Sequence, residues 1–273
     1  IPAEPLFRSR VINERTLVIN PLRWENGMYR MDLDAFREQI KGCKLFILCN
    51  PHNPGGVVWT EAELRAIADI CYDEKVLVFS DEIHADLTLP PHTHRPFATV
   101  SEKARMNSVT FMSPSKAFNM PGLSASHALI FNEDLRKRFR IYMDAGELDM
   151  GHVFAFLSVE AAYSHGTEWL DQCLAYIQGN IDFVDEFLKK HAPKIKAIRP
   201  EASYLVWLDC RELELSQKDL NEFFVDKAHL ALNDGEMFGK EGIGFMRLNV
   251  ASPRCIIEKA MKQLADAYQL YIK

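Results

Sequence analysis

Three apolar runs of strand-forming residues, each ending in polar side chains, constrain the fold of this chain more than any other feature. The runs occupy residues 45–50, 76–84 and 108–116. An apolar run without alternation is typical of a strand that is buried on both faces. A helical pattern lies between the first two runs, and strands that alternate with helices form a parallel sheet covered by helices. We therefore expect an α/β fold with a mostly parallel sheet.

Several other elements of this region can be placed from the residue pattern. Thr60 stands at an N-cap position with Glu63 three residues later, which is the capping box of a helix through about Asp73. The remaining expected elements are a strand at Leu17–Ile19, a turn at Trp24–Gly27, a helix near Asp32–Lys41, a strand near His127–Phe131, and helices at Glu133–Met143 and Val153–Tyr163.

The pattern changes in the C-terminal third of the chain. Thr167–Lys190 has the period of a long amphipathic helix, which Pro193 would end because proline cannot continue a helix. The elements expected after it are strands at Ala202–Leu208 and Gly244–Val250, and helices at Ser216–Lys227 and Pro253–Ile272. We therefore expect a large domain over residues 1–170, and over residues 171–273 the long helix with a smaller α+β domain.

The polar residues at the three strand ends are the candidate functional groups. Ligands of open α/β sheets bind at the carboxyl edge of the strands. Lys116 follows one run, and a desolvated lysine amine is nucleophilic enough to form a Schiff base with a carbonyl cofactor. Asp81 could serve as the anion facing a pyridinium nitrogen, and Asn53 could donate a hydrogen bond into the same site. Alternatively, Asp81 caps the next element and Asn53 only shapes a turn.

Four segments in the order and spacing of a known family carry a resemblance that extends over nearly the whole chain. The segments are Asn53-Pro-Gly-Gly56, Asp81-Glu-Ile-His-Ala-Asp86, Ser113-Pro-Ser-Lys-Ala-Phe-Asn119 and Arg247-Leu-Asn-Val-Ala-Ser-Pro-Arg254. They resemble the fold-type I pyridoxal-phosphate (PLP) enzymes of aminotransferase class I/II. Within that class they are most similar to the cystathionine β-lyase-type C–S lyases, the MalY/PatB group. The resemblance implies a PLP-dependent transferase-like large domain.

The resemblance implies a role for each matching residue. Lys116 would hold PLP as a Schiff base and then move the substrate's α-proton, and Asp81 would keep the pyridine nitrogen protonated. Arg247 would bind the substrate α-carboxylate through its planar guanidinium. The other implied cofactor contacts are Asn53 with the phenolic oxygen, Ser113 and Ser115 with the phosphate, and His84, which replaces a tyrosine of many aminotransferases and favours the lyase group.

The resemblance implies a carbon–sulfur β-lyase that converts cystathionine or cysteine-type amino acids to pyruvate, ammonia and a thiol. An aminotransferase of the same fold shares the first step of this chemistry, so it remains an alternative. A divergent relative with a binding or regulatory role remains a third. The resemblance also implies a homodimer, because the family's active sites form between two subunits.

Two departures from the family pattern concern the start of the chain. The family has a longer N-terminal portion with a Gly-containing phosphate loop, which no segment of this sequence matches. Glu4 stands where the family places an aromatic residue that stacks on the cofactor ring. We therefore expect that the sequence is a fragment of a longer enzyme, rather than a divergent relative with reduced activity.

Composition excludes several other function classes. The net charge of −6 argues against non-specific binding to nucleic acid or anionic membranes. The longest apolar runs fall short of the roughly 18–20 residues that a membrane span needs. The six scattered cysteines predict reduced thiols in a cytoplasmic protein. We expect no metal site, since His92 and His94 lie in a proline-flanked loop typical of a solvated surface.

Overall fold

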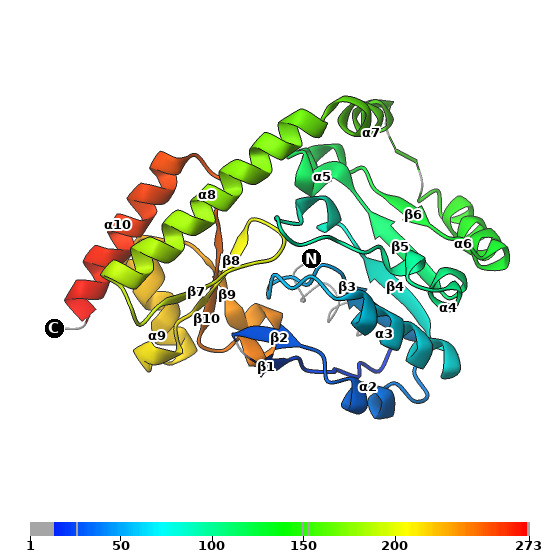
Figure 1. Ribbon diagram of the computed structural model, residues 1–273, viewed down its shortest axis with the longest axis horizontal. Helices are drawn as coiled ribbons and strands as arrows, with labels where there is room; N and C mark the ends of the chain where they lie inside the picture. Colours follow the sequence, from blue (N-terminus) through cyan, green and yellow to red (C-terminus); the bar gives the residue numbers. More distant parts are fainter. Residues whose placement is uncertain (1–13, 26, 149, 152, 272–273) are drawn as a thin grey trace. The chain divides into compact units, whose positions relative to one another are not determined.

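The computed structural model describes residues 14–25, 27–148, 150–151 and 153–271 (Figure 1). Contacts divide the chain into two compact units. The α/β unit contains Met31–His52 and Val57–Leu174, and the C-terminal unit contains Ile1–Arg30, Asn53–Gly56 and Ala175–Lys273. Glu4 lies outside the described residues. Of the helices that are described, none combines the length and the apolar character needed to cross a membrane.

The α/β unit is built on a four-stranded sheet in the order β3-β4-β5-β6 (Figure 1). Its strands are β3 (Leu45–Cys49), β4 (Leu77–Asp81), β5 (Ser108–Met112) and β6 (His127–Leu129). The first three run parallel, and β6 pairs with β5 in the antiparallel direction. Val78 and Val109 are almost completely buried in the two inner strands, as the continuous apolar runs predict. The predicted mostly parallel sheet is therefore confirmed.

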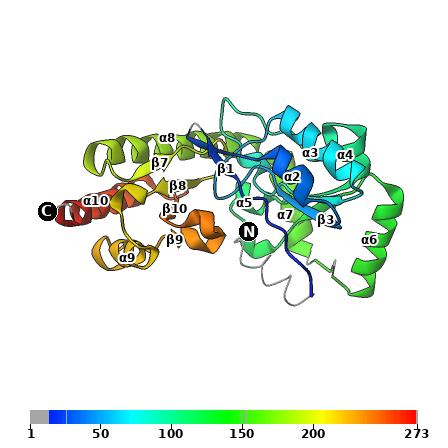
Figure 2. The ribbon, with the colours of Figure 1, turned by 90° about the horizontal axis from the view of Figure 1, so that it is seen from below.

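Helices accompany the strands of this unit as the alternating pattern predicts. They are α2 (Leu33–Gln39), α3 (Glu61–Asp73), α4 (Glu102–Met106), α5 (Pro114–Ala117), α6 (Glu133–Ala145) and α7 (Val153–His165). The capping box of α3 is present, because Thr60 accepts from the Glu63 amide while Glu63 accepts from the Thr60 amide. Figure 2 shows α3 and α4 side by side beside the sheet. Leu64 and Ile67 of α3 are fully buried, so this helix covers part of the core.

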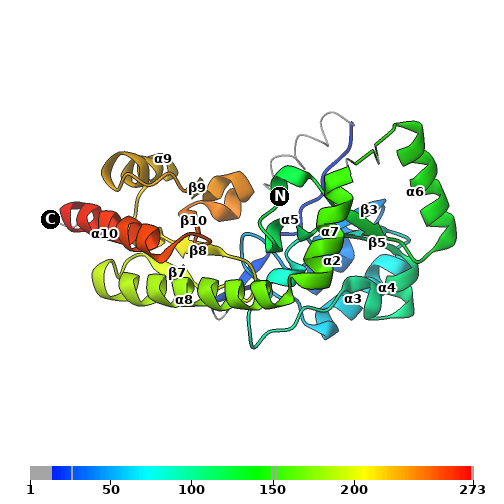
Figure 3. The ribbon, with the colours of Figure 1, turned by 90° about the horizontal axis from the view of Figure 1, so that it is seen from above.

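The C-terminal unit has an antiparallel sheet in the order β7-β8-β10-β9. Its strands are β7 (Lys196–Ile198), β8 (Leu205–Asp209), β9 (Asn233–Asp234) and β10 (Phe245–Asn249). Within this unit, the part of α8 (Thr167–His191) from Ala175 onward lies beside α10 (Arg254–Tyr271), as Figure 3 shows. The buried Asn180 of α8 donates to the carbonyls of Val250 and Ser252, which fixes the end of β10 against the helix.

One local prediction is wrong. Leu17–Ile19 forms no strand in the structure, and Val18 and Ile19 are about half exposed, so a strand there would have no buried face. The strands of this region are instead β1 (Arg23–Glu25) and β2 (Met28–Arg30), an antiparallel hairpin whose turn contains Gly27 at a φ of 81°. The helix predicted at Ser216–Lys227 is confirmed, and it consists of α9 (Gln217–Glu222) followed directly by a π-helical turn (Phe223–Lys227).

Candidate active site

The carboxyl edge of the sheet in the α/β unit brings together five of the predicted site residues. Asp81 is the last residue of β4, where its backbone is paired with Cys49 of β3 and Phe111 of β5. His84 follows in the turn after β4. Ser113, Ser115 and Lys116 follow β5, in and just before α5. Parallel strands end at one edge of a sheet, so the two neighbouring strands deliver these groups to the same place.

The Asp81 carboxylate is half-buried and held by the backbone. Its Oδ1 atom accepts a hydrogen bond from the Ile83 amide at 3.3 Å. Burial raises the pKa of Asp81, while the Ile83 amide and the positive charge of Lys116 oppose that rise. The influence of Lys116 on this pKa shows that the amine and the carboxylate lie in one electrostatic environment.

Lys116 is a half-buried amine on the four-residue helix α5. It forms no hydrogen bond or ion pair with any residue that the structure describes. Lysines are rarely withdrawn from water without a partner, because removing the charge from water costs free energy. An amine in such surroundings is suited to react with a carbonyl group.

Ser113 and Ser115 form a small hydrogen-bonded network at the start of α5. Ser113 Oγ caps the helix by accepting from the Ser115 amide, and the two hydroxyl oxygens lie 2.8 Å apart. Both hydroxyls also lie within hydrogen-bond distance of the Ala125 carbonyl, at 2.6 and 3.2 Å. Each hydroxyl has one proton, so donating to a phosphate would require it to turn away from this network. The phosphate contact of these serines stays a prediction.

His84 occupies the turn that leaves β4. It is buried, and its backbone carbonyl accepts from the Leu87 amide at 3.0 Å, which closes a 3-10 turn over Ala85–Leu87. The His84 imidazole therefore lies at the start of a hydrogen-bonded turn, three residues after Asp81.

The C-terminal unit brings together the other two predicted residues, Arg247 and Asn53. Arg247 lies in the middle of β10, and its Nη1 donates to Asn53 Oδ1 at 3.0 Å. Asn53 belongs to the Asn-Pro-Gly-Gly loop, and its Asn53–Pro54 peptide bond is cis, as is the Asn50–Pro51 bond shortly before the loop.

The Arg247 guanidinium is half-buried without an acidic partner among the residues described. Its Nη2 donates to Asn233 Oδ1 at 2.9 Å, and the group lies 4.5 Å from the centre of the Phe238 ring. Burial lowers the pKa of Arg247. Its buried Nε atom has no hydrogen-bond partner in the described part of the chain. The partners of the Arg247 cation are all neutral, and its Nε–H group can still donate a hydrogen bond. Such a guanidinium is suited to bind an anion.

Sequence reasoning missed three groups near these residues. Asn233 lies opposite Arg247 in the β9–β10 pairing, but a strand of two residues leaves no pattern to detect. Glu82 stands in the quoted segment after Asp81, and only its position in a buried strand end could have drawn attention to it. Its partner is His94, at 2.7 Å. Within the described ranges, no cluster of three or more potential metal ligands exists.

The sequence pattern of the family described as aminotransferase class I and II matches residues 9–264. The chain belongs to the aminotransferase class I and II family. Membership of this family, and the likeness to the relatives below, confirm the predicted resemblance and the predicted fold class.

Named relatives and a solved structure narrow the likeness within the family. The chain is 37% identical to cystathionine beta-lyase PatB of Bacillus subtilis strain 168, an alignment covering 96% of this chain and 68% of PatB. It is 34% identical to protein MalY of Escherichia coli K12, covering 82% of this chain and 57% of MalY. Cystalysin from Treponema denticola, whose structure contains pyridoxal 5'-phosphate, matches with a TM-score of 0.95 at 34% identity, over 98% of this chain and 68% of cystalysin. The chain thus spans roughly two thirds or less of each relative.

The residues of the α/β unit fit pyridoxal phosphate. The cofactor needs an amine that can react with its aldehyde and an anion that can face its ring nitrogen. Lys116 is a half-buried amine without a partner among the residues described, and Asp81 supplies a carboxylate in the same environment. The Lys116 amine and the Asp81 carboxylate therefore meet both requirements of pyridoxal phosphate.

Proposed function

We propose that this protein is a PLP-dependent carbon–sulfur β-lyase acting on cystathionine or a related cysteine-type amino acid. The observation that carries the proposal is the half-buried Lys116 amine, which has no hydrogen bond or ion pair among the described residues and shares its surroundings with Asp81. The likeness to cystathionine beta-lyase PatB supports the choice of a lyase. His84 supports it too, as the residue that sets the lyase group apart from many aminotransferases.

Each predicted residue has a role in this proposal. Lys116 would hold the cofactor covalently and then accept the α-proton of the substrate. Asp81 would hold a proton on the ring nitrogen by facing it as an anion. Asn53 would bind the phenolic oxygen, His84 would lie near the cofactor, and Ser113 and Ser115 would lie near the phosphate. When bound, the cofactor supplies an electron sink for the carbanion at the substrate α-carbon.

Arg247 would fix the substrate by its α-carboxylate. The guanidinium is already oriented by amide oxygens on both sides and by the Phe238 ring, so little side-chain freedom is lost on binding. The overall reaction breaks the bond between the β-carbon and sulfur. With one water molecule, the amino acid is converted to a thiol, pyruvate and ammonia.

The proposal extends to the assembly and location of the protein. Several apolar side chains of α6, α7 and the segment between them are largely exposed, with Tyr142 72% and Met150 76% accessible. Exposed apolar surface of this kind supports a homodimer. No disulfide forms among the described residues, which include all six cysteines, and this supports a cytoplasmic protein. We also propose a cofactor-binding domain over residues 1–170 and, over residues 171–273, the interdomain helix with a small domain. This division differs from the contact-based units, which group residues 1–30 and 53–56 with the C-terminal part of the chain.

The proposal is tested by incubating the purified protein with PLP and cystathionine and measuring pyruvate. The wild type should form pyruvate, and Lys116→Ala should form none. Lys137→Ala is the matched control, because Lys137 is an exposed lysine paired with Glu133 on α6. This control should keep wild-type activity.

Borohydride reduction of the same samples separates the alternatives. Covalent labelling at Lys116 without pyruvate, but with formation of a keto acid and an aminated cofactor, would identify an aminotransferase. Absence of both labelling and products would mean that the protein is a relative without this chemistry.

A further inference from the structure

Glu82 is a fully buried acid that the proposed chemistry does not use. Its side chain has no exposed surface. The Oε1 atom accepts from Ser80 Oγ and from the Phe97 amide, each at 2.8 Å. The Oε2 atom accepts from His94 Nε2 at 2.7 Å. A buried carboxylate is tolerated only when donors replace the water that it loses, and here three donors converge on one acid.

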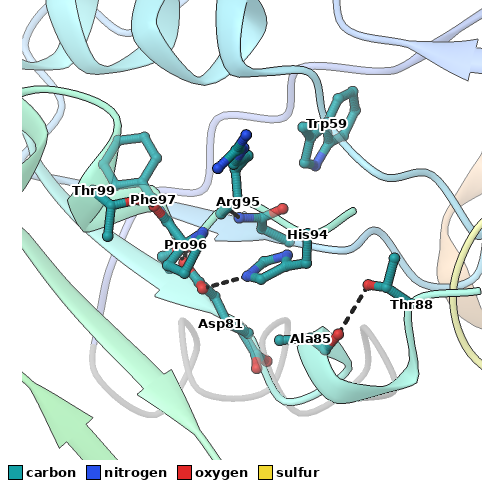
Figure 4. Close-up of polar contacts among 12 residues, drawn as sticks. Trp59, Asp81, Ala85, Thr88, His94, Arg95, Pro96, Phe97 and Thr99 are labelled. Carbon is teal, nitrogen blue, oxygen red and sulfur yellow. Dashed lines mark hydrogen bonds and ion pairs between the residues drawn. The ribbon is translucent and has the colours of Figure 1, made fainter. Parts of the chain in front are cut away.

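His94 belongs to the loop whose His-x-His sequence first suggests a surface or a metal site. Figure 4 shows its imidazole pointing back toward the end of β4, where Asp81 lies. The His94 Nε2 atom is 2.7 Å from Glu82 Oε2. The same loop is anchored twice more. Asn50 Nδ2 donates to the Arg95 carbonyl at 3.2 Å, and Phe97 is completely buried. The loop is therefore fixed to the strand ends and is not a loose surface segment.

Glu82 is also the residue next to Asp81, and the backbone between them is held from both sides. The Asn50 amide donates to the Asp81 carbonyl, and the Glu82 amide donates to the Phe111 carbonyl, at 2.9 and 2.8 Å. Ser80 and Glu82 reach the same side of the chain, as the hydrogen bond between their side chains shows. Side chains alternate along an extended chain, so Asp81 is directed to the opposite side.

We propose that Glu82 and His94 are positioning residues that hold Asp81 in the orientation needed to face the cofactor's ring nitrogen. The inference rests on the proposed function. Hydrogen bonds to both carboxylate oxygens of Glu82 fix the peptide that links Glu82 to Asp81. They act on the side of the chain opposite to the Asp81 side chain.

The charge of Glu82 supports a positional role over an electrostatic one. A second negative charge beside Asp81 raises the pKa of that carboxyl and so opposes the anion that the ring nitrogen needs. Burying an acid is costly as well. The contribution that favours function is therefore the rigid set of hydrogen bonds through Ser80, Phe97 and His94.

The test measures the dissociation constant of PLP for His94→Gln and Glu82→Gln. His92→Gln is the matched control, since His92 is exposed two residues earlier in the same loop. We expect each positioning variant to weaken PLP binding at least about fivefold, and the control to stay within about twofold of wild type. If Glu82→Gln does not fold, His94→Gln decides, because it leaves the buried acid two of its three donors.

Two further measurements distinguish positioning from general support of the fold. In the Asp81→Asn background, His94→Gln should have almost no further effect on PLP binding, because it acts through Asp81. The ¹⁵N chemical shift of the ring nitrogen in labelled PLP should move toward its unprotonated value in His94→Gln.

Fully additive losses, or an unchanged ring-nitrogen shift, would overturn the inference and leave the proposed function intact. The same conclusion follows if His94→Gln binds PLP as tightly as His92→Gln. A wild-type protein that does not bind PLP at all would overturn both proposals.

Discussion

Lys116 and Arg247 are half-buried cations without an acidic partner among the described side chains. Arg30 and Arg254 share this property, but Arg254 donates to Asn180. Several exposed basic residues are paired with acids, for example Arg65 with Glu61 and Lys189 with Asp185. Such exposed pairs contribute little to stability. Removing an unpaired cation from water costs free energy, and a ligand that supplies an anion or a carbonyl group would offset this cost at Lys116 and Arg247.

For Arg247, we predict that lysine is not an adequate replacement. Lysine cannot keep both the Asn53 and the Asn233 hydrogen bonds and also present a planar pair of donors. Arg247→Lys should raise KM for the amino acid about 10- to 100-fold, with a smaller change in kcat. Steady-state kinetics checks this, with the exposed Arg199→Lys as control. An equal loss for a substrate carrying a carboxamide in place of the α-carboxylate would contradict the prediction.

For Asp81, we predict opposite effects on stability and on cofactor binding. A carboxyl whose folded pKa is raised stabilises the folded state at pH below its ordinary value of 3.8, and this contribution is lost as the pH rises. At neutral pH, Asp81→Asn should therefore stabilise the cofactor-free protein by roughly 1 kcal/mol, while weakening PLP binding. Urea denaturation at pH 4 and pH 7 checks the first effect. A gain of equal size at both pH values would contradict it.

At the scale of elements, the Asn-Pro-Gly-Gly loop is held by its second glycine. Gly56 has a φ of 69°, a conformation that favours glycine. A Cβ atom there would lie 2.6 Å from Pro200 Cβ and 2.8 Å from Pro200 Cα. The Gly56 carbonyl also accepts from the Glu201 amide at 2.8 Å. The loop that carries Asn53 is thus packed directly against the chain before β8.

We predict that Gly56→Ala is strongly destabilising, because it combines an unfavourable φ with a backbone clash. The expected loss is about 2–4 kcal/mol in the free energy of unfolding. Gly122→Ala is the control: its φ is not in the left-handed region and nothing lies within 4 Å of its added Cβ, so it should change stability by less than about 0.5 kcal/mol. Chemical denaturation measures both. Equal stability of the two variants would show that the loop moves freely.

Elements with strong local signals are predicted well, and short ones are not. The helix that begins after Thr60 carries its own capping box, so its start is encoded in four residues. In contrast, β7 has three residues and β9 has two. Such short strands form because β8 and β10 provide their hydrogen-bonding partners. The residue pattern of two or three residues is too short to predict them.

At the scale of the whole molecule, His52 makes folding stability depend on pH. Burial lowers the pKa of this imidazole from 6.5 to about 4, so protonation favours the unfolded state. Its contribution to stability is full above about pH 6.5 and is lost as the pH falls toward 4. The wild type should lose roughly 3 kcal/mol across this window through His52. His52→Gln should show a flatter curve and His92→Gln the wild-type curve, measured by denaturation at each pH. Parallel curves for His52→Gln and wild type would contradict the prediction.

The sequence by itself determined the fold class and predicted which groups react. Continuous apolar runs require a buried parallel sheet, and polar residues at the carboxyl ends of such strands are delivered to one edge, so Asp81 and Lys116 could be named in advance. Only the tertiary structure decided what orients them. Glu82 meets His94, and Arg247 meets Asn233, through contacts between residues 12 and 14 positions apart in the chain. Such contacts depend on how loops and strands pack, and no local pattern encodes that.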